Sequence, residues 1–285
     1  AMGTSVGSKA LTLKQAIIIA AIFEFLGAYL AGGEVTSTIR KGIVDPQLYA
    51  NDLNIFIIGM MSSLLAAGFW LYIASNKGWP VSTTHSIVGA IVGFVLITKG
   101  IDAVSWFTVG EIASSWITSP LIAGILAFFI YLSAKKLIID AKNQVTAAIF
   151  YIPFYSFFVA GVIAQVIARK GLSHIGLTWS DNEIWFFTAL IALLTGGLTS
   201  LALRLNKESI SSKGGIEYAF GILMIVTACA MAFAHGSNDV ANAIGPLAAI
   251  ISVVNSSDLS STAPINPAIL LLGGAGIVLG LSTLG

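Results

Sequence analysis

Long apolar runs that are almost free of charge restrict what this chain can fold into. An α-helix needs about 20 consecutive apolar residues to cross the hydrocarbon core of a bilayer. Hydrophobic residues make up 56% of the chain and charged residues only 9%, whereas soluble domains carry about 25% charged residues. The sequence therefore predicts an all-α polytopic membrane protein. Helix-length runs lie near residues 11–32, 53–74, 109–134, 145–168, 184–205, 216–234 and 268–285.

Two further apolar runs, 81–98 and 237–254, begin at clusters of glycine, proline, asparagine and serine and carry polar side chains. Irregular backbone at membrane depth is tolerated only where protein or a cavity satisfies its polar groups. We therefore expect both runs to be broken or re-entrant helices, as in transporters.

Basic residues orient part of the chain, because cytoplasmic loops carry an excess of lysine and arginine. Two loops are rich in basic residues, and two spans separate them, so both loops lie on the same side of the membrane. We predict that this side is cytoplasmic. The sidedness of the segments before Val109 stays open. The basic residues of these loops are Lys135, Lys136, Lys142, Arg204, Lys207 and Lys213.

A dense polar stretch interrupts the apolar sequence between His235 and Asn242. A charge at bilayer depth costs several kcal/mol unless it faces the bundle interior or water. At helical spacing of three and four residues, His235, Asp239 and Asn242 share one broad face. Carboxylate and carboxamide oxygens suit a hard cation such as sodium. The alternative is that these side chains only form structural hydrogen bonds between helices. The density of polar groups disfavours it.

A second polar cluster, Pro-Val-Ser-Thr-Thr-His at 80–85, reads as a helix start. Proline suits the first helical turn, and serine or threonine caps it. Ser82, Thr83 and Thr84 would offer hydroxyls beside free N–H groups, which is a ready anion site. The alternative is an ordinary capped helix at the interface, although three hydroxyls exceed what a cap needs.

Glu24 lies at the centre of the first long run, where a carboxylate predicts a transport role or a satisfied structural group. The runs 17–32, 81–97 and 216–254 contain no lysine or arginine. A bound anion would therefore be neutralised by hydroxyls, N–H groups and co-bound cations, which favours cation coupling.

Other classes of function are disfavoured. A net charge of +1 does not indicate the strongly basic surface that binds nucleic acid. The single cysteine excludes a framework of disulfide bonds. Ser82, with His85 or His235 and Asp239, matches the residue types of a hydrolytic triad. However, Ser82 and His85 would share one helix start, and no Gly-x-Ser-x-Gly motif occurs. We therefore predict that this chain is not an enzyme. A passive channel is a third alternative.

Three motifs resemble the inorganic phosphate transporters, the PiT family. His-Gly-Ser-Asn-Asp-Val-Ala-Asn-Ala at 235–243 and the cluster at 80–85 resemble that family's paired signatures, and Phe-Glu-Phe-Leu-Gly at 23–27 resembles a third stretch. The family's first half normally carries Gly-Ala-Asn-Asp-Val-Ala-Asn before the Ala-Met-Gly at 1–3, and its second half another Pro-x-Ser-Thr-Thr. We therefore expect that outer segments are missing from this chain.

The resemblance implies two inverted repeats, here 1–143 and 216–285 joined by a connection at 144–215. It implies a multi-pass protein of the plasma or inner membrane that moves inorganic phosphate by symport with sodium, without a cofactor. Proton-coupled phosphate transport and sulfate transport are alternatives within the family. The expected partners are phosphate, sodium and the lipid bilayer, and a homodimer is a further expectation.

The resemblance also implies roles for individual residues. The expected phosphate contacts are Ser82, Thr83, Thr84 and Ser237, and the expected sodium ligands are Asp239, Asn242 and Asn238. Residues expected to couple the ions or to lie beside the site are Glu24, His85, His235, Thr4 and Ser5.

Overall fold

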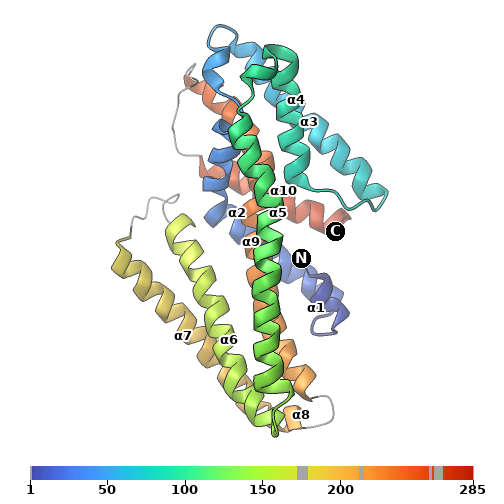
Figure 1. Ribbon diagram of the computed structural model, residues 1–285, viewed down its shortest axis with the longest axis vertical. Coiled ribbons are helices and arrows are strands. Elements are labelled where there is room, and N and C mark those ends of the chain that lie inside the picture. The colour runs from blue at the N-terminus through green and yellow to red at the C-terminus, as the bar shows by residue number, and fades with distance from the viewer. Residues whose placement is uncertain (1, 172–178, 212–214, 257–258, 260–265, 285) are drawn as a thin grey trace. The chain divides into compact units, whose positions relative to one another are not determined.

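The computed structural model describes residues 2–171, 179–211, 215–256, 259 and 266–284, and over these residues the chain is helical apart from turns and one isolated bridge. Figure 1 labels the helices. They are α1 (Gly3–Gly7), α2 (Leu13–Lys41), α3 (Leu53–Asn76), α4 (Thr83–Lys99), α5 (Trp106–Ala134), α6 (Gln144–Val166), α7 (Asp181–Leu205), α8 (Lys207–Ser211), α9 (Gly215–Ser256) and α10 (Pro267–Leu284). Short 3₁₀ or π turns lie at Pro46–Tyr49, Ile101–Ala103, Lys135–Ile139 and Ile167–Gly171.

Among the described residues, 6 helices are long and apolar enough to cross a membrane. This confirms the prediction of an all-helical, multi-pass membrane protein. The apolar helices α4 and α10 are shorter than these spans. The spans are Leu13–Gly33, Leu53–Asn76, Trp106–Ile139, Gln144–Arg169, Asp181–Leu205 and Gly215–Asn255.

One expected break is present and the other is not. The run at 81–98 forms a separate short helix, α4, whose first turn is capped by the Ser82 hydroxyl. The expectation of a break before residue 237 is wrong, because α9 continues for 42 residues through Gly236 and Pro246. Gly236 serves close packing instead: a Cβ atom there would overlap the backbone of Glu24 in α2.

The chain divides into two compact units, each assembled from two separate stretches. The first unit comprises residues 1–23 and 115–233, and the second comprises 24–114 and 234–285. The boundaries fall inside α2, α5 and α9, so each of these helices contributes to both units. The division into inverted repeats at 1–143 and 216–285 concerns internal symmetry and stays a prediction.

In the first unit, α6 and α7 pair as an antiparallel hairpin (Figure 1). The side-chain amide of Gln165 donates to the Thr188 hydroxyl at 3.0 Å, and Gly161 packs beside Ala192. Residue numbers thus rise on α6 as they fall on α7. Lipid tails are as apolar as leucine, so such helices associate mainly by close packing of small residues. The small buried residues of α6 and α7 are Ala148, Ser156, Ala160, Ala164, Thr188, Ala192, Gly196 and Thr199.

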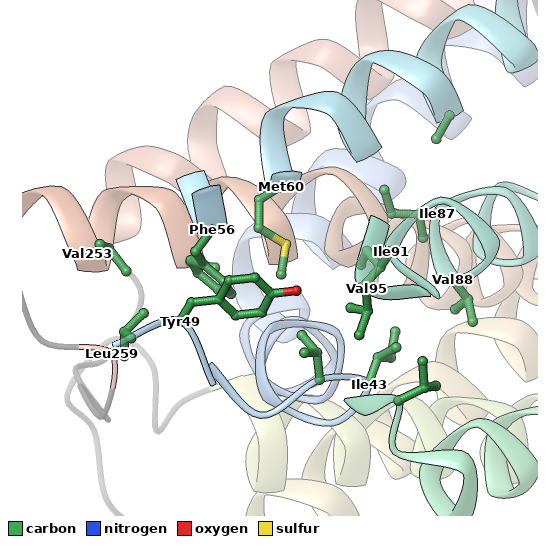
Figure 2. Close-up of a cluster of buried hydrophobic side chains, with 14 of the residues drawn as sticks. Ile43, Tyr49, Phe56, Met60, Ile87, Val88, Ile91, Val95, Val253 and Leu259 are labelled. Carbon is green, nitrogen blue, oxygen red and sulfur yellow. The ribbon is translucent and has the colours of Figure 1, made fainter. Parts of the chain in front are cut away.

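In the second unit, α3 and α4 pack together around a buried apolar cluster, shown in Figure 2. The Tyr49 ring lies 5.6 Å from Phe56 and 5.3 Å from Phe94, between ring centroids. The Tyr49 hydroxyl pairs with that of Thr98 at 2.6 Å. Ala241 and Val253 of α9 belong to the same cluster. The cluster therefore holds α4 against the second half of α9, which is the contact that builds the site.

Candidate functional site

Glycines let three helices of the second unit approach closely. A Cβ atom on Gly32 of α2 would overlap Val240 of α9. A Cβ atom on Gly274 of α10 would lie 2.9 Å from the Phe25 ring of α2. Small residues at such seams allow the helix backbones to come together. The seam between α2 and α9 brings the first long run against the polar stretch of α9.

At this seam, His235 lies between two carboxylates. Its Nδ1 atom is 3.2 Å from Glu24 Oε1, and its Nε2 atom is 3.0 Å from Asp239 Oδ2. Glu24 is only 3% exposed, and a buried carboxylate is costly unless it is paired and hydrogen-bonded. His235 therefore supplies the partner that the sequence around Glu24 lacks. Its imidazole links Glu24 of α2 to Asp239, which lies one turn further along α9.

Asp239 and Asn242 also contact the start of α4. The Thr83 hydroxyl donates to Asp239 Oδ1 at 3.3 Å. The Asn242 side-chain amide donates to the hydroxyls of Thr83 and Thr84 at 3.1 and 3.2 Å. Asn242 is buried, whereas Thr83, Thr84 and Asp239 are partly exposed. Residues more than 150 positions apart in sequence therefore converge within one compact unit.

These contacts form one continuous polar network from α2 through α9 to α4. We call it the acid–hydroxyl network, and its members are Glu24, His235, Asp239, Thr83, Asn242 and Thr84. It combines carboxylate, amide and hydroxyl oxygens, which bind cations, with hydroxyl groups and the N-terminus of α4, which bind anions. Over the described part of the chain, no group of three or more His, Cys, Asp and Glu side chains is arranged to hold a metal ion.

Other candidate residues occupy different surroundings. The Ser237 hydroxyl donates to the Ala31 carbonyl at 3.2 Å and thereby ties α9 to α2. Ser82 is the cap of α4, accepting the His85 backbone N–H at 3.2 Å. The side chains of His85 and Asn238 are exposed.

Thr4 and Ser5 belong to the first unit, where Thr4 is exposed and Ser5 is buried. The roles assigned to all candidate residues in ion binding stay predictions.

Sequence reasoning missed the parts of the site that are backbone or glycine. The Ala31 carbonyl gives no side-chain signal, and Gly236 suggested a break in the helix instead of close packing. A glycine next to the polar residues of an apolar run is the signal that could have indicated a tight helix contact.

Comparison with known proteins agrees with the motifs. Residues 1–285 match the phosphate transporter family. A relative from Haemophilus influenzae, named as a phosphate permease, is 47% identical over 291 residues, covering 100% of this chain and 69% of the relative. The chloroplastic inorganic phosphate transporter 2-1 of Arabidopsis thaliana is 38% identical, covering 100% of this chain and 52% of that protein.

A solved structure, described as the sodium-dependent phosphate transporter, is similar with a TM-score of 0.91 and 36% identity, over 100% of this chain and 70% of that one. The family resemblance inferred from the motifs is confirmed, and the family is one of transporters, not of enzymes. This chain belongs to the phosphate transporter family.

Proposed function

We propose that this chain moves inorganic phosphate across a membrane by symport with sodium, through alternating access. One observation carries the proposal: Asp239 and Asn242 of α9 contact the hydroxyls of Thr83 and Thr84 at the start of α4. An acid and a hydroxyl run in direct contact, within a phosphate transporter family member, fit the simultaneous binding of a cation and an anion.

The start of α4 supplies what an anion needs. Thr83 and Thr84 lie in the first turn after the Ser82 cap, where backbone N–H groups have no helical acceptor. The helix dipole places about half a positive charge there. Phosphate oxygens would accept hydrogen bonds from these N–H groups and from the two hydroxyls.

The carboxylates then create the need for a cation. A phosphate beside Asp239 and Glu24 is repelled unless positive charge lies between them. His235 can supply one such charge when protonated, and sodium bound by Asp239 and Asn242 would supply more. The similarity to a sodium-dependent transporter favours sodium for this role.

The carboxylates also suggest how phosphate is distinguished from sulfate. At neutral pH phosphate retains a proton that sulfate lacks, and a nearby carboxylate can accept that proton in a hydrogen bond. Sulfate offers no such donor, so its oxygens would face the carboxylate directly. Selectivity for phosphate would then arise from the acid, not from the hydroxyls.

Uptake of radiolabelled phosphate into liposomes that contain the purified chain tests the proposal. We expect an inward sodium gradient to accelerate uptake and unlabelled phosphate, but not sulfate, to compete. Uptake driven by a proton gradient alone would replace sodium symport with proton symport, and effective competition by sulfate would identify a sulfate carrier. Absence of any phosphate uptake above protein-free liposomes would contradict the proposal.

A further inference from the structure

The first unit contains a cavity of about 1030 Å³ that the transport mechanism does not use. Its walls come from the segment before α2, the start of α6, the end of α8 and the first turns of α9. It adjoins a packed core that includes Ile138, Ile210 and Ala219. Pockets that hold small molecules have volumes of about 300–1,000 Å³, so this cavity is large enough to bind a ligand.

One end of the cavity is polar and lies where helices begin. Gln144 and Gly215, the first residues of α6 and α9, both line it, as do Lys9 and Glu217. Lys9 has a φ of 62° and is the only non-glycine residue with positive φ in the described part of the chain. Such a backbone conformation costs free energy and is concentrated at functional sites.

Most of the remaining lining is apolar, and part of it follows α9 into its span. Phe220, Ile222, Met224 and Ile225 line it beyond the polar end. From Gly215 to Ile225 the helix rises about 15 Å, at 1.5 Å per residue. That distance is about half of the 30 Å hydrocarbon core, the thickness of one leaflet. The cavity thus has a polar end and an apolar length that match a single lipid.

We propose that this cavity binds a glycerophospholipid whose headgroup carries a primary amine. Its phosphate pairs with the Lys9 ammonium and lies at the N-termini of α6 and α9, which favour anions. Its ammonium donates hydrogen bonds to the Glu217 carboxylate. Its acyl chain lies along the apolar part of α9.

The pair of charges selects this headgroup over others. Lys9 and Glu217 both line the cavity and are exposed, so a ligand in the cavity can reach both charges. A headgroup with only a negative charge leaves Glu217 unmatched and places the anion beside it. A quaternary ammonium has no N–H to donate to the carboxylate.

Native mass spectrometry of the purified, delipidated chain with an equimolar, acyl-matched mixture tests this proposal. The mixture contains phosphatidylethanolamine, phosphatidylcholine and phosphatidylglycerol. We expect phosphatidylethanolamine to be retained about tenfold over phosphatidylcholine. Glu217→Gln should bring that ratio close to one, and Lys9→Gln should weaken retention of both lipids while preserving the ratio. Binding is measured without transport, so the result does not depend on the proposed function.

Matched variants locate the site. Lys14→Gln and Glu208→Gln remove exposed charges that do not line the cavity, and we expect both to retain the wild-type ratio. Gly221→Leu projects a side chain past Ala10 into the cavity and should reduce retention of every lipid. Circular dichroism checks that each variant is folded. Equal retention of the three lipids by the wild type, a preference for phosphatidylglycerol, or an unchanged ratio in Glu217→Gln would overturn the proposal.

Discussion

At the scale of single residues, Thr83 and His235 are the junctions of the acid–hydroxyl network. Thr83 contacts both Asp239 and Asn242, and His235 contacts both Glu24 and Asp239. Each side chain therefore contacts two other members of the network at once. Substitutions at these two positions separate the role of hydrogen bonding from the role of charge.

Thr83→Val should reduce phosphate uptake at least about tenfold, because it removes a hydroxyl shared by an acid and an amide while keeping the side chain's volume. The measurement is initial uptake into liposomes at a fixed sodium gradient. Thr98→Val, which removes a hydrogen-bonded hydroxyl elsewhere in α4, is the matched control. Equal uptake by the two variants would show that the Thr83 hydroxyl is not required.

His235→Gln should lower the initial rate of phosphate uptake by about tenfold or more, because it removes the one group that can carry positive charge between the two carboxylates. Glutamine can still donate a hydrogen bond to a carboxylate, but it cannot gain the positive charge that lies between Glu24 and Asp239. Uptake is compared with that of Thr98→Val at one fixed pH and sodium gradient. Uptake equal to that of the control would exclude His235 from charge balance.

At the scale of helices, close packing of α2 against α9 positions the network. Glu24 reaches His235 because α9 presents Gly236 to the α2 backbone, with no side chain between them. The sequence predicted the helical spans and the capped start of α4 from hydropathy and capping residues. It could not predict which spans touch, because two apolar helix faces look alike until a glycine or a polar pair distinguishes them.

Gly236→Ala should lower the free energy of unfolding by about 1–3 kcal/mol, the usual cost of overpacking a tight contact. The added methyl group would overlap the Glu24 backbone, which cannot move aside as a flexible side chain can. Thermal unfolding in detergent measures the effect. Gly276→Ala in α10 introduces the same change where no atom lies within 4 Å. A loss of stability in Gly276→Ala equal to that in Gly236→Ala would contradict this account.

At the scale of the whole molecule, membrane character and family followed from the sequence, whereas the division into units did not. Hydropathy identifies spans one at a time, but the two compact units are made of separated stretches and share α2, α5 and α9. The prediction of a break before residue 237 was wrong because glycine and proline were read by their local preferences. In α9 the packing of neighbouring helices overrides those preferences.

The proline inside α9 has a consequence for the site. Pro246 has no N–H, so it cannot donate to the carbonyl of Asn242, the residue four positions earlier whose side chain contacts Thr83. That oxygen therefore keeps a lone pair which helical geometry would ordinarily occupy. A backbone oxygen of this kind would be a neutral ligand for a desolvated ion, and the helix itself holds it in place.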